Sequence, residues 1–237
     1  MLRASPPQRA AGALLAMPKD RIEHLLAVMD GRLIARMIVA TDPGRRVALL
    51  RHLDDSRLAA ELALLPTVEA AAVLAVLPLD RARPQLERGT PEQLALLLEA
   101  VPKAQRARLI AALDPLREAG LRRVAYEKSV IEALRQTAAS LEWVFDDHGS
   151  NLLAGAFHRL FGVALRYVDA GPLPEVAVAD AYRVFAGRRV HGLLIVTNAY
   201  ADGERMMPNQ DPGGLVVSWG SGDNVGVLGR ALVRLAG

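Results

Sequence analysis

The strongest constraint in this sequence is a twelve-residue repeat that runs through its first half. Residues 6–113 divide into nine consecutive units of twelve residues without an insertion. The ninth position of every unit is Leu or Ile, and the eighth and twelfth positions are each apolar in seven of the nine units. A period this regular indicates a stack of equivalent structural units. Each unit opens with Pro, Asp or Thr, and the openers are Pro6, Pro18, Asp30, Asp42, Asp54, Pro66, Pro78, Thr90 and Pro102.

Each unit is predicted to form one short helix followed by a turn. Proline suits the first turn of a helix because its missing N–H is not needed there, and Asp or Thr can accept hydrogen bonds from the free amides of that turn. Apolar residues at unit positions 5, 8, 9 and 12 form one stripe along such a helix. A helix of about nine residues is unstable alone. The units must therefore stack, and we expect an α superhelix with an exposed, arginine-rich outer face.

Residues 30–78 read DGRLIARMIVATDPGRRVALLRHLDDSRLAAELALLPTVEAAAVLAVLP. This segment resembles the cytosolic N-terminal domain of MgtE-type magnesium transporters and the related repeats of the flagellar motor protein FliG. In those families short helices headed by Pro or Asp build a superhelix, and the resemblance covers residues 6–117. It implies a regulatory or protein-binding role. The transporter domain senses magnesium through acidic surfaces, so a magnesium-responsive regulator is one alternative, although the repeats here carry more basic than acidic residues.

The distribution of aromatic residues divides the chain. All of the two Trp, four Tyr and four Phe residues follow position 125. The first half must fill its core with aliphatic side chains alone. We therefore expect a helical repeat domain at 1–120, a long connecting helix at 121–147 and a small α/β domain at 148–237.

The connecting helix carries a narrow apolar seam with 3,4,3,4 spacing. One interpretation is a linker helix that packs on both domains. The other is a homodimer formed through a coiled coil of the 125–145 helix. The segment Asp146-Asp147-His148-Gly149 is expected to end the helix. The seam consists of Ile131, Leu134, Ala138, Leu141 and Phe145.

The last segment alternates apolar runs with helix-like patterns. Strands are predicted at 163–168, 192–197 and 214–219, since these runs are apolar on both faces. Alternating strands and helices favour a parallel three-stranded sheet with helices on each side. The helices are predicted at 149–161, 178–188, 201–207 and 223–236, the last with Asp223 as its cap.

Ligands of parallel sheets bind beyond the carboxyl ends of the strands. The glycines at 220, 222 and 226 are similar to a nucleotide-binding loop, but a turn followed by a helix cap is the simpler interpretation. Arg188, Arg189 and His191 precede a strand and are candidate contacts for phosphate or nucleic acid, with a solvated turn as the alternative. The candidate ligand-binding residues at the strand ends are Asp169, Thr197, Asn198, Trp219, Ser221 and Asp223.

Residues 150–237, with the runs GLLIVTNAYADGERMM and GLVVSW, also resemble the tail of restriction-endonuclease-like domains of the Mrr type. Such nucleases place an Asp and an E-x-K motif on adjacent strands to hold a divalent metal. No lysine follows Lys128, so that motif cannot exist here. Asp169 and Glu175 are the acids nearest the required place. No catalytic residue, metal site or cofactor is therefore predicted.

Composition limits the remaining function classes. The net charge of +3, from 29 Lys+Arg and 26 Asp+Glu, is small for a dedicated nucleic-acid binder. The chain has no cysteine, which excludes disulfides and thiol catalysis. No apolar run approaches the roughly 20 residues that span a bilayer, and no signal-peptide pattern opens the chain, so we expect a cytoplasmic protein. The leading hypothesis is a non-enzymatic adaptor that binds a protein partner; the alternative is a DNA-binding or nuclease effector.

Overall fold

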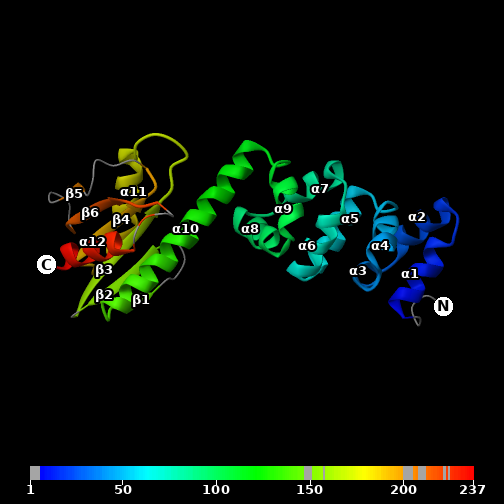
Figure 1. The fold of residues 1–237 in the computed structure, drawn as a ribbon, viewed down its shortest axis with the longest axis horizontal. Helices are drawn as coiled ribbons and strands as arrows, with labels where there is room; N and C mark the ends of the chain where they lie inside the picture. Colours follow the sequence, from blue (N-terminus) through cyan, green and yellow to red (C-terminus); the bar gives the residue numbers. More distant parts are fainter. Residues whose placement is uncertain are drawn as a thin grey trace. The chain divides into compact units, whose positions relative to one another are not determined.

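The structure is a computed structural model that describes residues 6–146, 151–156, 158–199, 205–207, 212–220, 223 and 225–237. The chain divides into two compact units, Met1–Leu121 and Arg122–Gly237. Each unit is described by itself below, and both are drawn in Figure 1. None of the helices among the described residues is long and apolar enough to cross a membrane.

The first unit consists of short helices that begin where the repeat predicts. Each of the nine predicted openers is the N-cap of a helix of eight to ten residues. The twelve-residue period is therefore the helix period. The helices are α1 (Pro7–Leu15), α2 (Lys19–Val28), α3 (Gly31–Ala40), α4 (Pro43–Leu50), α5 (Asp55–Leu64), α6 (Thr67–Val76), α7 (Leu79–Leu86), α8 (Pro91–Ala100) and α9 (Lys103–Ile110).

The openers act in two ways. The side chain of Asp54 accepts a hydrogen bond from the amide of Arg57 at 2.7 Å, and Asp30 and Asp42 cap their helices in the same way. Thr90 forms a reciprocal capping box with Gln93. The proline openers make no side-chain cap and stand one residue before the helix, where their fixed φ and their carbonyl start the first turn.

The apolar stripe forms the core of the first unit. Seven of the nine Leu or Ile residues at the ninth position are buried, and Leu62 and Ile110 pack against that core. The helices pack mainly on the next but one along the chain: α1 on α3, α3 on α5, and α6 on α8. The helices thus share one aliphatic core.

Most described arginines of this unit are exposed, as expected, but some of them also bond to the chain itself. Several arginines reach back about three helices and donate hydrogen bonds to carbonyl groups that end an earlier helix. Those carbonyls have no partner within their own helix, and a guanidinium supplies several donors at once. The bonds join Arg57 to Met29, Arg81 to Leu50 and Leu53, Arg108 to Ala75 and Leu77, and Arg117 to Glu87 and Gly89.

The second unit is built on a mixed sheet that holds six strands among the described residues, in the order β1-β2-β3-β4-β6-β5. The three predicted strands form its parallel centre, β3, β4 and β6, but the prediction of a three-stranded sheet is wrong because antiparallel strands extend it at both sides. The strands are β1 (Val144–Asp146), β2 (Asn151–Ala156), β3 (Arg159–Arg166), β4 (Gly192–Thr197), β5 (Arg205–Met207) and β6 (Gly214–Ser218).

Two predicted helices are strands instead. The run 149–161 contributes β2 and the start of β3, which pair antiparallel with Leu153 opposite Gly162. A short apolar run can form a helix or a strand, and in this segment the hydrogen bonds between β2 and β3 favour the strand. Of the predicted helix 201–207, the described residues 205–207 form β5. The other positions of that prediction, 201–204, lie outside the described residues.

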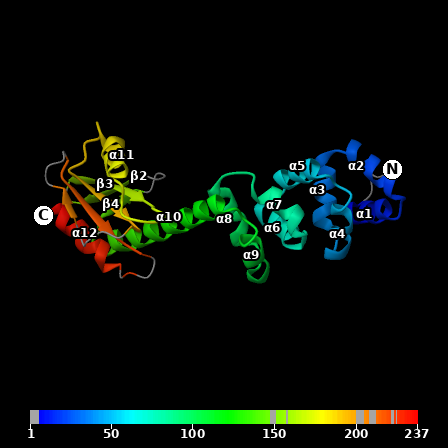
Figure 2. The same cartoon turned by 90° about the horizontal axis from the view of Figure 1, so that it is seen from above.

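Helices cover both faces of this sheet (Figure 2). Residues 122–140 of α10 (Pro115–Ser140) and α12 (Gly226–Ala236) pack on one face, and α11 (Glu175–Phe185) packs on the other. The seam residues Leu134 and Ala138 are buried within this unit. The chain's own sheet therefore covers the seam that a homodimer would use.

The helix α10 ends earlier than predicted. Its last residue is Ser140, and Glu142 follows with a left-handed φ of 58°. The amide of Trp143 donates to the carbonyl of Ala138, the pattern of a Schellman termination. Asp146 belongs to β1, and the remainder of the predicted stop, residues 147–149, lies outside the described residues.

Candidate functional site

The predicted ligand site lies where β3, β4 and β6 end. A hollow of about 430 Å³ opens there, between residues 168–172 after β3 and Asn198 and Ala199 after β4. Asp169 and Asn198 line it, whereas Thr197, Trp219 and Asp223 do not. Ser221 lies outside the described residues. The structure therefore brings together only part of the predicted set.

Asn198 holds the loop after β3 in place. Its Oδ1 accepts from the amide of Val168, and its Nδ2 donates to the carbonyl of the same residue, both at 2.7 Å. The side chain thus imitates one more pair of sheet hydrogen bonds. Both polar atoms of the amide are used within the chain, which makes Asn198 a structural residue.

Thr197 and Asp169 have partners of their own. Thr197 is fully buried, and its Oγ1 accepts from the amide of Ala199 at 3.0 Å. Asp169 lies 3.6 Å from the guanidinium of Arg122, and both side chains are half exposed. An exposed pair of this kind contributes little free energy. The hollow is lined by satisfied groups and one solvated ion pair.

Trp219 belongs to a buried aromatic cluster rather than to the hollow. Its ring lies 6.5 Å from that of Tyr126, which in turn lies 5.7 Å from Tyr167. The indole Nε1 of Trp219 and the hydroxyl of Tyr126 are buried, and neither has a hydrogen-bond partner in the part of the chain that the structure describes. Burial, followed by the nearby charges of Asp223 and Glu127, raises the pKa of Tyr126 well above its usual value. Tyr126 therefore stays a neutral core residue.

Asp223 closes a turn instead of capping the last helix. Its Oδ2 accepts from the amide of Gly220 at 2.6 Å, and its own amide donates to the carbonyl of Gly220. The helix α12 begins at Gly226 with Val225 as its N-cap. The prediction that Asp223 caps this helix is therefore wrong, although the turn interpretation of the glycines fits residues 220–223 as far as they are described.

The candidate phosphate contacts lie before β4, at the opposite end of the parallel strands. The Nδ1 of His191 accepts from the amide of Leu160 at 3.0 Å, which extends the pairing of β3 and β4. Arg188 lies over the ring of Phe185, 5.6 Å from its centroid. Arg189 is exposed. His191 and Arg188 thus have contacts within the chain, and all three side chains are exposed.

The central strands of the sheet carry no carboxylates. Within β2, β3, β4 and β6 no residue is Asp or Glu, and Glu175 is the first residue of α11. Where β2 and β3 pair, Asn151 stands opposite Ala164. Among the described residues no three His, Asp or Glu side chains are grouped as metal ligands. The arrangement offers no observation that favours nuclease chemistry.

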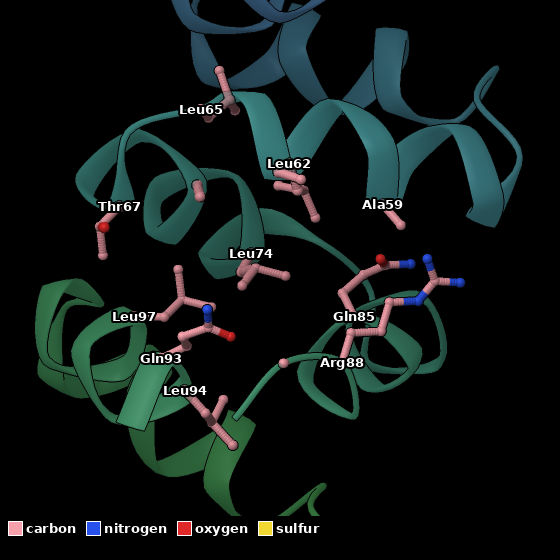
Figure 3. A pocket seen from close by; sticks show the side chains of 13 residues that line it. Ala59, Leu62, Leu65, Thr67, Leu74, Gln85, Arg88, Gln93, Leu94 and Leu97 are labelled. Carbon is pink, nitrogen blue, oxygen red and sulfur yellow. The ribbon is translucent and has the colours of Figure 1, made fainter. Parts of the chain in front are cut away.

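The first unit contains a groove that sequence analysis did not identify (Figure 3). It has a volume of about 380 Å³ and is lined by residues of α5 and its C-cap (59–65), α6 (67–74), the end of α7 with the turn that follows it (85–89) and α8 (93–97). Leu62, Leu74 and Leu97 surround its apolar part, while Gln85 and Arg88 form the opposite side. We call it the α5–α8 groove.

Two polar features of the α5–α8 groove stand out. Gln85 is 7% exposed, and its Nε2 donates to the carbonyl of Asp55. Its Oε1 is buried and has no hydrogen-bond partner within the described residues. Arg88 is exposed, and among the described residues its side chain has no ion pair or hydrogen-bond partner. The sequence repeat does indicate an irregularity at this place, because Gln85 and Gly89 interrupt the apolar eighth and twelfth positions of their unit.

Comparison with known proteins adds no assignment. No family model matches the chain, and neither the curated proteins nor the solved structures contain a match to it.

Proposed function

We propose that the protein is a non-enzymatic adaptor whose stacked helices, forming a superhelix, bind a protein partner in the α5–α8 groove. The α/β unit would supply a second contact. The observation that carries the proposal is the groove itself, whose lining residues are Ala or Leu apart from Thr67, Gln85, Arg88, Gly89 and Gln93. Its volume of about 380 Å³ lies in the range of ligand pockets in proteins.

The surface next to the groove supports a protein partner. Leu64, Val68 and Leu96 are 50%, 70% and 60% exposed, and each is a chain neighbour of a lining residue. Exposed large apolar side chains on the helices that form a groove are typical of interaction sites, because their burial by a partner is favourable. A small solute confined to the groove would leave these three side chains in water.

The use of the arginines also favours a protein over a nucleic acid. Binding to a phosphate backbone depends on cationic side chains that are free to contact it. In the first unit Arg57, Arg81, Arg108 and Arg117 donate instead to backbone carbonyls within the chain. Their guanidinium groups serve the stacking of the helices.

The test uses the full chain and a variant that fills the groove. Ala63 is exposed, lies on α5 and lines the groove, so Ala63→Trp should occupy it without disturbing the core. Ala60 is exposed on the same helix but does not line the groove, and Ala60→Trp is the matched control. Circular dichroism would verify that both variants keep the wild-type helix content.

Helical peptides would be selected on the wild-type chain from a displayed library, and their affinity for each variant measured. The proposal predicts selected peptides that bind the wild type and Ala60→Trp equally and lose affinity for Ala63→Trp. If every selected peptide binds Ala63→Trp as tightly as the wild type, the groove is not the binding site and the proposal is wrong.

A further inference from the structure

We infer that the partner segment in the α5–α8 groove is an amphipathic helix that places a carboxylate on Arg88 and a hydrogen-bond donor on Gln85. This inference rests on the proposed function, because it specifies the partner of the same groove. Three features of the groove support this inference: backbone hydrogen bonds already made within its walls, an apolar part formed by leucines, and the charge of Arg88.

The lining favours a helix over an extended segment. Every wall of the groove is a helix or the turn that follows one, so its backbone hydrogen bonds are already made within the chain. The carbonyl of Gly89, in that turn, already accepts from Arg117 at 2.7 Å. An extended peptide would bury backbone N–H and C=O groups without partners, whereas a helix satisfies its own.

The apolar part of the groove requires an apolar stripe on that helix. Leu62 comes from α5, Leu74 from α6 and Leu97 from α8, and Figure 3 shows them around one space. Residues three and four apart lie on one face of a helix, so leucines at such spacing would contact all three walls. The chain's own helices pack on one another through the same kind of stripe.

The charge of the lining requires a carboxylate. Arg88 is the one charged residue among the described residues that line the groove. Its chain neighbour Glu87 is engaged elsewhere, with its Oε1 2.9 Å from the Nε of Arg83. A carboxylate on the partner would therefore meet an uncompensated guanidinium, and it can accept two hydrogen bonds from it.

Gln85 specifies the second polar contact. Its side chain is more than nine-tenths buried, and its Oε1, which has no partner among the residues that the structure describes, can only accept. A buried acceptor without a partner costs free energy that a donor would recover. A hydroxyl or amide group on the partner helix, close to its carboxylate, would supply that donor once the side chain of Gln85 turns its Oε1 toward the groove, since this oxygen is buried in the free chain.

The test measures fluorescence anisotropy of two labelled peptides with the full chain at about 0.15 M salt. The first probe is a groove-binding amphipathic helical peptide whose leucines are three and four residues apart, with Glu at the polar position next to the leucine stripe. The second probe is the same peptide with Gln in place of that Glu. The protein variants are Arg88→Glu and Arg83→Glu. Arg83 is exposed on the same α7 and does not line the groove, so it controls for the change in net charge.

The wild type should bind the Glu peptide about fivefold more tightly than the Gln peptide, as expected for one solvent-accessible ion pair. Arg88→Glu should reverse this preference, and Arg83→Glu should keep it. Ala63→Trp should weaken both peptides. If binding depends on Ala63 but the two peptides bind alike, the inference about the carboxylate is wrong and the proposed function stands. If Ala63→Trp leaves the binding of both peptides unchanged, the proposed function fails and this inference fails with it.

Discussion

The Nε of Arg57 lies 2.8 Å from Oε1 of Glu61, and the Glu61 side chain is 1% exposed. This carboxylate also covers the start of α3, since a Cβ on Gly31 would lie 3.1 Å from both of its oxygens. A larger residue at this position would require the Glu61 side chain to shift by a few tenths of an ångström. Helix N-termini favour a negative charge, yet burial raises the pKa of Glu61, an effect that Arg57 opposes and Asp30 adds to.

The raised pKa of Glu61 makes stability depend on pH. A carboxyl group whose pKa is higher in the folded than in the unfolded state stabilises the fold fully below its usual value of 4.5, and this contribution is lost as pH rises through the folded value. Glu61→Gln imitates the neutral form and keeps an acceptor for Arg57. We expect the free energy of unfolding of this variant to rise relative to wild type between about pH 4 and pH 7.

Urea denaturation followed by circular dichroism at several pH values measures this difference. Glu69→Gln, a partly exposed position on α6, is the control and should follow the wild-type pH profile. A constant difference between Glu61→Gln and wild type across this range would contradict the prediction.

The arginines that donate to carbonyls at the end of an earlier helix, which we call arginine caps, predict a larger effect on the free energy of unfolding. Arg81 is 19% exposed and donates to the carbonyls of Leu50 and Leu53, at the end of α4. Arg81→Met should lower the free energy of unfolding by about 3 kcal/mol, because two charged hydrogen bonds are lost and the carbonyl of Leu53 loses its donor, while the carbonyl of Leu50 keeps the amide of Leu53. Arg83→Met on the same helix removes an exposed pair with Glu87 and should cost less than about 1 kcal/mol. Equal losses in urea denaturation would show that the caps do not stabilise the stack.

The starts of the short helices could be predicted because they depend on local chemistry. Asp54 caps an amide only three residues away, and a proline acts through its own φ. The arginine caps could not be predicted in this way, because Arg108 bonds Leu77, 31 residues earlier in the chain. Such bonds depend on which helix stacks on which, and the period alone does not specify that.

The groove and the strand β2 also depend on contacts between segments that are distant in the sequence, so they could not be predicted from local chemistry. The interruptions of the eighth and twelfth positions were visible, and Thr41, Glu61 and Gln85 among them are buried polar residues. Which of these residues lines a groove depends on how α5, α6, α7 and α8 pack together. β2 was predicted as part of a helix because its apolar residues fit either period, and its pairing with β3 decides between them.

Gly162 on β3 predicts a steric effect in the second unit. A Cβ at this position would come within 2.7 Å of the ring of Phe185, which packs from α11 onto the sheet. Gly162→Ala should therefore destabilise the unit by about 1–3 kcal/mol, the usual cost of overpacking a core. Gly155→Ala on β2 meets no atom closer than 3.8 Å and is the control. Both tryptophans, Trp143 and Trp219, lie in this unit, so their fluorescence reports its unfolding.

Adding Phe185→Leu to Gly162→Ala should recover part of the loss, because the smaller side chain leaves room for the new methyl group. If the double variant is as unstable as the sum of the two single variants, the contact with Phe185 is not the cause.

The two hydrogen bonds between Asn198 and Val168 predict a local change at the end of β3. Asn198→Ala removes a donor and an acceptor, and it leaves the amide and the carbonyl of Val168 without these partners. We expect a loss of about 1–2 kcal/mol in the free energy of unfolding and faster hydrogen exchange at the amide of Val168. Asn198→Asp keeps the acceptor for that amide but loses the donor to the carbonyl, so it should protect the amide better than Asn198→Ala does. Exchange at Val168 that stays at the wild-type rate in Asn198→Ala would show that the loop is held by other contacts, and the hollow beside it would then not depend on Asn198 for its shape.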